Sequence, residues 1–196
     1  MQATTIKSIW RTCARFVWLL MFLWPQIALS EKWTVVEHGK NLTFSVLTEV
    51  PNGDEMMLLE GRFPDWAAAI DIDFDDLNGS FIEIAVDLSS VDLSRASLKT
   101  DLVGQQWFDA KRHPTAVFRS DSVLATEDGY AAHGTLSLKG IEATLALAFK
   151  LTPSGELVQV QGRGHLDRFA WNIGDATPAS VVESQVTIRF DFRARH

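Results

Sequence analysis

Histidines and acidic residues are the side chains of this protein that could hold a metal ion. The five histidines stand at positions 38, 113, 133, 165 and 196, and none has the two- or four-residue spacing typical of metal sites. The acidic run from Asp71 to Asp76 resembles the start of a calcium loop. However, Asp76 stands where that loop needs glycine, and Ile82 stands where it needs glutamate. The sequence therefore predicts no metal site, and an acidic outer strand face at this run.

Patterns for nucleophilic catalysis or phosphate binding are equally weak. The chain contains no Gly-x-Ser-x-Gly motif, and its serines near histidines have no identifiable third partner. Gly162 and Gly164 lack the strand-then-helix context of a phosphate-binding loop. Asp167 and Arg168 could form a polar site, although such a pair more often caps a turn. We therefore expect a protein that is not an enzyme and requires no cofactor.

The first thirty residues are organised like a secretory signal peptide. Lys7, Arg11 and Arg15 precede an apolar run at 16–23, and small residues follow near Ser30. A transmembrane anchor is the alternative, but the run is shorter than the roughly 20 residues that a spanning helix needs. We expect cleavage near Ser30, export from the cytoplasm, and no stable membrane insertion afterwards.

Residues 31–196 then form one acidic domain. They carry 15 Lys and Arg against 25 Asp and Glu, a formal charge of −10, and they contain no cysteine because Cys13 lies in the signal segment. Nucleic acid is excluded as a partner because phosphate binding needs a basic face. The 166 residues are enough for one well-buried core.

Apolar and polar residues alternate with a period of two over most of this domain. The pattern is clear at 42–46, 70–75, 82–88 and 185–193, and Asn78-Gly79 predicts a tight hairpin between the second and third of these runs. Such runs, joined by short turns, predict an all-β sandwich or up-and-down barrel of about eight to ten strands.

One segment, at about residues 94–106, breaks the alternation. Leu98 and Leu102 stand four apart, and Ser94 is a plausible N-cap, so we expect one amphipathic helix here. A helix in mid-chain favours a barrel, because it can lie across an open end. The interior of a barrel of about eight strands is either filled by side chains or left to hold one ligand, and the pattern does not choose between them.

The chain resembles the YceI-like family of bacteria over essentially all of 33–192. The resemblance rests on Trp107-Phe108-Asp109, Pro114-Thr115-Ala116-x-Phe118-x-Ser120, Gly134-x-Leu136-x-Leu138-Lys139-Gly140 and Arg168-x-x-x-Asn172-Ile173-Gly174. It implies an extended, lipocalin-like antiparallel barrel of about eight strands with a helix over its mouth, exported to the periplasm. It also implies non-catalytic binding or transport of a long apolar lipid, such as a polyisoprenoid quinone.

The resemblance implies no catalytic residues, and it assigns residues only as positions that line the barrel interior or its rim. The candidates for the barrel lining are Phe44, Phe74, Phe81, Trp107, Phe108, Phe118, Leu138 and Phe149. The candidates for a head-group rim are Lys99, Lys111, Arg112 and Lys139. A membrane cytochrome or another quinone-using protein is a candidate partner, and an oligomer stays open.

Two other functions remain as alternatives. A barrel filled by its own side chains would serve as an envelope stress or interaction protein. An enzyme acting on an apolar substrate is the less favoured alternative, because an active site needs clustered titratable residues. The acidity of the domain favours a neutral quinone-like head over a diphosphate.

Overall fold

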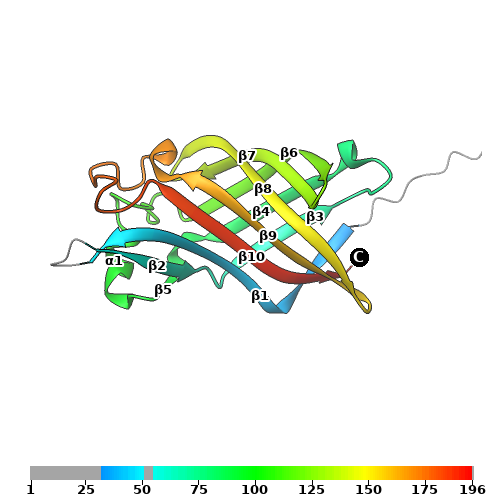
Figure 1. Cartoon of the computed structure of the whole chain (residues 1–196), viewed down its shortest axis with the longest axis horizontal. Helices are drawn as coiled ribbons and strands as arrows, with labels where there is room; N and C mark the ends of the chain where they lie inside the picture. Colours follow the sequence, from blue (N-terminus) through cyan, green and yellow to red (C-terminus); the bar gives the residue numbers. More distant parts are fainter. Residues whose placement is uncertain (1–31, 51–54, 196) are drawn as a thin grey trace, which may run out of the picture.

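The computed structural model describes residues 32–50 and 55–195, and it shows an antiparallel β-barrel (Figure 1). The expected signal peptide at 1–30, with Cys13, lies outside the described residues. The strands are β1 Lys32–Glu49, β2 Met56–Arg62, β3 Trp66–Asp71, β4 Phe81–Asp87, β5 Asp92–Leu93, β6 Thr115–Thr126, β7 Gly129–Leu138, β8 Ile141–Ser154, β9 Leu157–Asp167 and β10 Gln185–Arg195. The predicted all-β barrel is confirmed.

Eight of these strands close the barrel. Their order is β10-β9-β8-β7-β6-β4-β3-β1, and β1 returns to pair with β10. β1 joins β3 through only two residue pairs, and from Thr43 to Glu49 the same edge pairs with β2 instead. The short strand β5 continues this extension beyond β2. One long strand, β1, therefore belongs to both the closed barrel and its extension.

The connection between β3 and β4 differs from the predicted hairpin. The two strands pair as expected, with Ile70 opposite Ile82, but the loop between them ends in a 3-10 turn, η1, at Leu77–Gly79. The Asp73 carboxylate accepts the Asp75 N–H at 2.9 Å, and the Asp76 carboxylate accepts the Asn78 N–H at 3.1 Å. These side-chain bonds stabilise a wider loop than the Asn-Gly pair alone would form.

The helix predicted at 94–106 is much shorter in the structure. α1 covers only Lys99–Leu102, after a 3-10 turn η3 at Ala96–Leu98. The Ser94 hydroxyl does not cap it, since it accepts the Glu60 N–H at 3.2 Å. Beyond α1 the chain folds back on itself, because the Phe108 N–H donates to the Leu102 carbonyl at 3.0 Å. Turn bonds within 102–110 thus replace the later helical turns.

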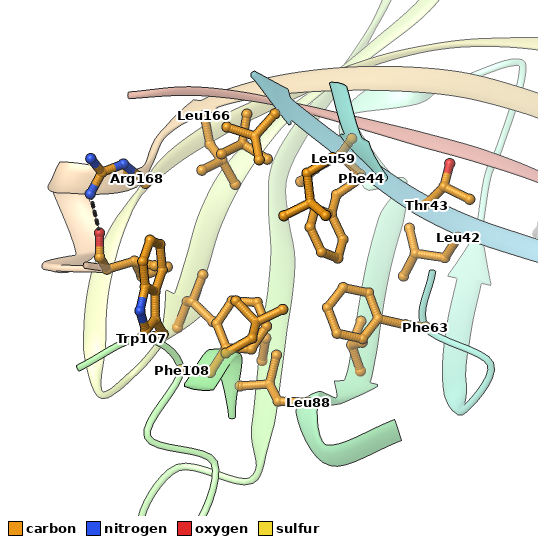
Figure 2. A pocket seen from close by; sticks show the side chains of 18 of the residues that line it. Leu42, Thr43, Phe44, Leu59, Phe63, Leu88, Trp107, Phe108, Leu166 and Arg168 are labelled. Atoms are coloured by element: carbon orange, nitrogen blue, oxygen red, sulfur yellow. Dashed lines mark hydrogen bonds between the residues drawn. The ribbon is translucent and has the colours of Figure 1, made fainter. Parts of the chain in front are cut away.

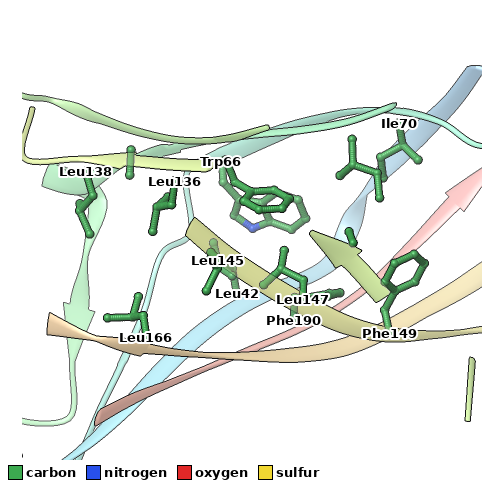
Figure 3. Packing of buried hydrophobic residues seen from close by; sticks show 14 of the residues in the cluster. Leu42, Trp66, Ile70, Leu136, Leu138, Leu145, Leu147, Phe149, Leu166 and Phe190 are labelled. Atoms are coloured by element: carbon green, nitrogen blue, oxygen red, sulfur yellow. The ribbon is translucent and has the colours of Figure 1, made fainter. Parts of the chain in front are cut away.

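Alternate residues of each strand point into the barrel and form one core. Figure 3 shows Leu136, Leu145, Leu147 and Phe149 from β7 and β8 turned toward Trp66 of β3. The outward neighbours in β8 are exposed, as the sequence alternation predicts. No helix among the described residues is long and apolar enough to cross a membrane.

Candidate ligand-binding cavity

A cavity of about 400 Å³ lies inside the end of the barrel near α1 (Figure 2). This volume is within the range of small-molecule sites, about 300–1,000 Å³. The lining is mostly apolar, and its residues come from all strands except β3, from α1 and from the loops. It includes Leu42, Phe44, Val46, Leu59, Phe63, Ile84, Val86, Phe108, Phe118, Leu136, Leu138, Leu145, Leu147, Leu166, Ile188 and Phe190.

A row of three phenylalanines forms one wall of this cavity. The ring centroids of Phe44 and Phe63 are 5.5 Å apart, and those of Phe63 and Phe108 are 6.0 Å apart (Figure 2). Gly61, on the neighbouring strand, makes room for the first ring, because a Cβ there would lie 2.4 Å from Phe44 Cε1. The Phe63 N–H donates to the Leu42 carbonyl at 2.9 Å, which holds this segment against β1.

Trp107 and Phe108 enter the wall from the turn that follows α1. The next residue, Asp109, has a φ of 49°, a left-handed conformation that reverses the chain after the aromatic pair. The Trp107 ring lies over Gly174, where a Cβ would be 2.7 Å from the ring. Gly174 itself has a φ of 56°, so both its conformation and its lack of a side chain suit this contact.

Arg168 is a buried cation beside the cavity, with a relative exposure of 1%. Its guanidinium donates five hydrogen bonds, all to backbone carbonyls. The acceptors and distances are Glu183 at 3.1 Å, Ile173 at 2.8 Å, Gly174 at 2.6 Å, Thr177 at 2.6 Å and Val182 at 2.9 Å. Burial lowers the pKa of Arg168, while the charges of Asp167 and Asp175 act in the opposite direction. Arg168 therefore holds the loop between η4 (Arg168–Trp171) and β10 in place.

The neighbouring Asp167 caps a turn, as the simpler interpretation of this pair predicts. Its carboxylate accepts the Phe169 N–H at 3.0 Å at the start of η4. The Arg168 guanidinium lies 4.1 Å from the Phe169 ring centroid and 5.7 Å from that of Trp107. All five of its donors are occupied, so the pair has a structural role.

The other charged residues of the cavity lining are Glu49, Arg95 and Asp101. Glu49 and Asp101 are exposed, which places them where the cavity meets solvent, and Arg95 is half-buried. The Arg95 guanidinium contacts the sulfur of Met57. Sequence reasoning missed all three, because none belongs to a motif and their segments meet only in the folded barrel.

Five of the eight predicted lining residues surround the cavity: Phe44, Trp107, Phe108, Phe118 and Leu138. The other three lie elsewhere. Phe74 and Phe81 are 49% and 40% exposed, and Phe149 is buried beside a second, much smaller cavity of about 30 Å³. The alternation in β4 explains Phe81, because Ile82 points inward and its neighbour must point outward.

None of the four predicted rim cations lines this cavity. Lys139 Nζ donates to the carbonyls of Gln106 at 2.9 Å and Asn172 at 2.5 Å, so it joins two loops on the outside. Arg112 binds the Asp109 carboxylate at 2.6 Å. Both cations border a separate polar hollow on the surface. Lys99 and Lys111 lie outside the lining as well.

Several lining residues were not among the predicted lining positions, for example Leu59, Phe63, Leu166 and Ile188. Ile188 lies in the predicted alternating run 185–193, and Leu166 lies on the strand β9 beside it, so both are apolar positions that a period of two places inside the barrel. Phe63 follows β2 in a short loop and carries no such signal. In the residues that the structure describes, no group of three His, Asp or Glu side chains could hold a metal ion.

Comparison with known sequences places the barrel in a family. A sequence model of the YceI-like domain matches residues 33–194. A UPF0312 protein of Yersinia pestis (strain Pestoides F) is 29% identical over 97 residues, which cover 50% of this chain and 50% of that protein. The chain thus spans about half the length of the curated relatives it matches.

Several solved structures share the fold. Burkholderia cenocepacia BcnA aligns with a TM-score of 0.71 at 24% identity and covers 81% of this chain and 98% of its own. A polyisoprenoid binding domain from Saccharophagus degradans aligns with a TM-score of 0.59 at 14% identity and covers 83% and 97%. With the barrel, its cavity and the match over 33–194 in agreement, this chain belongs to the YceI-like family.

Proposed function

We propose that this protein binds a long-chain apolar lipid, a polyisoprenoid such as a quinone, inside the barrel without acting on it chemically. The observation that carries the proposal is the apolar cavity of about 400 Å³ near α1. Burial of one methylene stabilises a complex by about 0.8 kcal/mol, so a prenyl chain needs no specific polar contact to bind tightly. The polyisoprenoid binding domain with the same fold supports this ligand class.

The charges around the cavity support a carrier with a neutral ligand. Its exposed edge carries two carboxylates, Glu49 and Asp101, and one cation, Arg95. A diphosphate would meet net repulsion there, whereas a neutral quinone-like head would not. Arg168 is already saturated by five carbonyls and offers a ligand no free donor. The cavity itself argues against a barrel filled by its own side chains.

Organic extraction and mass spectrometry of the full chain, purified from cells that export it, test this function. We expect one neutral prenyl lipid in near-stoichiometric amount. Leu136→Trp should abolish retention by filling the cavity, while Leu124→Trp on the exposed side of β6 should not. Lipid levels equal in the two folded variants, or no lipid in the wild type, would contradict lipid binding in this cavity. Prenyl diphosphate alone would contradict the neutral head.

We also propose that the domain works in the periplasm after cleavage near Ser30, where it would carry lipid to or from a quinone-using membrane protein. The charge pattern of the first thirty residues supports this location. Cell fractionation and N-terminal sequencing of the released protein test it. A chain found in the cytoplasm, or one that keeps its first residues, contradicts the proposal.

A further inference from the structure

The barrel interior is divided into two cavities that meet at one level. The larger cavity, of about 400 Å³, and the smaller, of about 30 Å³, share three lining residues: Ile84, Leu147 and Phe190. These residues come from β4, β8 and β10, so they face one another across the barrel rather than along one strand.

The order of lining residues along individual strands locates this boundary. Along β8, Leu145 lines only the larger cavity, Leu147 lines both, and Phe149 lines only the smaller one. Along β10, Ile188 likewise lines only the larger cavity, Phe190 lines both, and Phe192 lines only the smaller one. Inward-facing residues two apart in a strand are separated by about 7 Å along it. One layer of side chains therefore separates the two spaces.

Trp66 of β3 lines neither cavity but packs among the buried residues next to this layer. It is 6% exposed, and its ring centroid is 5.3 Å from that of Phe192 in an edge-to-face contact. Figure 3 shows it between Leu136 on one side and Phe149 on the other, which line the larger and the smaller cavity respectively. The Phe190 ring lies over Gly162, where a Cβ would be 2.2 Å from Phe190 Cζ.

We propose that this layer, the internal partition of Ile84, Leu147 and Phe190, sets the length of apolar chain that the protein accepts. The inference rests on the proposed lipid binding and deepens it, because it assigns chain-length selection to named residues. A chain that enters near α1 reaches the partition and can go no deeper. Further carbons must stay outside, exposed to water, and add no affinity.

Prenyl alcohols of 10, 15, 20 and more carbons test the proposal in competition with a fluorescent fatty probe. For the wild type, affinity should rise with chain length to a limit and then level off. Phe190→Ala should move that limit by at least one five-carbon unit. At the first longer chain it should bind at least tenfold tighter than wild type, because each buried methylene is worth about fourfold.

Phe149→Ala is the matched control, since Phe149 is as deeply buried as Phe190 but lines only the smaller cavity. It should leave the length limit unchanged. Phe190→Leu, a milder substitution, gives a second test if the alanine variant does not fold. An unchanged limit in the Phe190 variants, an equal shift in Phe149→Ala, or a wild type without a limit would overturn the partition. A wild type that binds no prenyl alcohol would instead overturn the proposed function.

Discussion

Replacement of Arg168 by methionine tests whether the loop before β10 depends on this one buried cation. A hydrogen bond to a charged group contributes about 1.5–3 kcal/mol, so five such bonds to carbonyls nominally exceed 7 kcal/mol. Removal of the charge also removes its desolvation cost, and water can reach some of the freed carbonyls. We therefore expect Arg168→Met to lower the free energy of unfolding by about 3–5 kcal/mol.

The measurement is urea unfolding of Arg168→Met beside Arg163→Met, which removes an exposed arginine from the same strand region. For a domain of this size, the expected loss corresponds to a melting temperature lower by roughly 10 °C. Arg168→Lys keeps the charge but offers three donors instead of five, so it should fall between wild type and Arg168→Met. If the free energies of unfolding of Arg168→Met and Arg163→Met differed by less than about 1 kcal/mol, Arg168 would not hold the loop as described.

Three further perturbations probe other parts of the barrel. Gly61→Ala should displace the Phe44 ring into the cavity. We expect a loss of about 1–3 kcal/mol in the free energy of unfolding and weaker lipid retention, measured by urea unfolding and by extraction. Unchanged lipid retention would contradict the displacement of the ring. Lys139→Met should lower the free energy of unfolding by about 1 kcal/mol, because two loop carbonyls lose their hydrogen-bond donor. An unchanged melting temperature would argue against a stabilising role of these two hydrogen bonds. Hydrogen bonds from Ser89 lower the pKa of Asp87, so this carboxylate stabilises the fold above about pH 4 and loses that effect as the pH falls through its lowered pKa. The stability difference between wild type and Asp87→Asn should therefore shrink from pH 5 to 2.5, and a constant difference would contradict this assignment.

The family motifs supply part of the cavity lining, for example Trp107, Phe118 and Leu138, and they also join the loops behind it. Lys139 joins the segments around Gln106 and Asn172, and Trp107 lies over Gly174. Asp109 turns the chain between these contacts and binds Arg112. The resemblance therefore identified the residues that build this end of the barrel, whereas most of the lining comes from ordinary apolar strand positions.

Local patterns predicted the strands well because each one leaves a signal in its own residues. Alternation at 82–88 and 185–193 corresponds to β4 and β10, and the alternating apolar residues that begin at Ile82 and Val186 face the core. The helix after Ser94 was predicted too long, since bonds from Phe108 and Glu60 redirect the chain. The bond between Glu60 and Ser94 joins residues 34 apart, and neither bond leaves a period-two or helical pattern in the sequence.

The sequence by itself determined the class of the barrel, its family, the absence of a recognisable catalytic motif and the acidity of the domain. Those properties depend on composition, alternation and short motifs, which are readable without coordinates. Only the tertiary structure decided which apolar residues enclose a cavity, and it placed Phe149 and Phe44 at different depths of the barrel. It also showed that Lys139, a predicted rim cation, instead connects two loops through hydrogen bonds to their carbonyls. The physical reason is that closure of the barrel brings together strands that are distant in sequence. The size of a cavity between them then depends on the side chains of all these strands at once, and no single segment of the sequence contains that information.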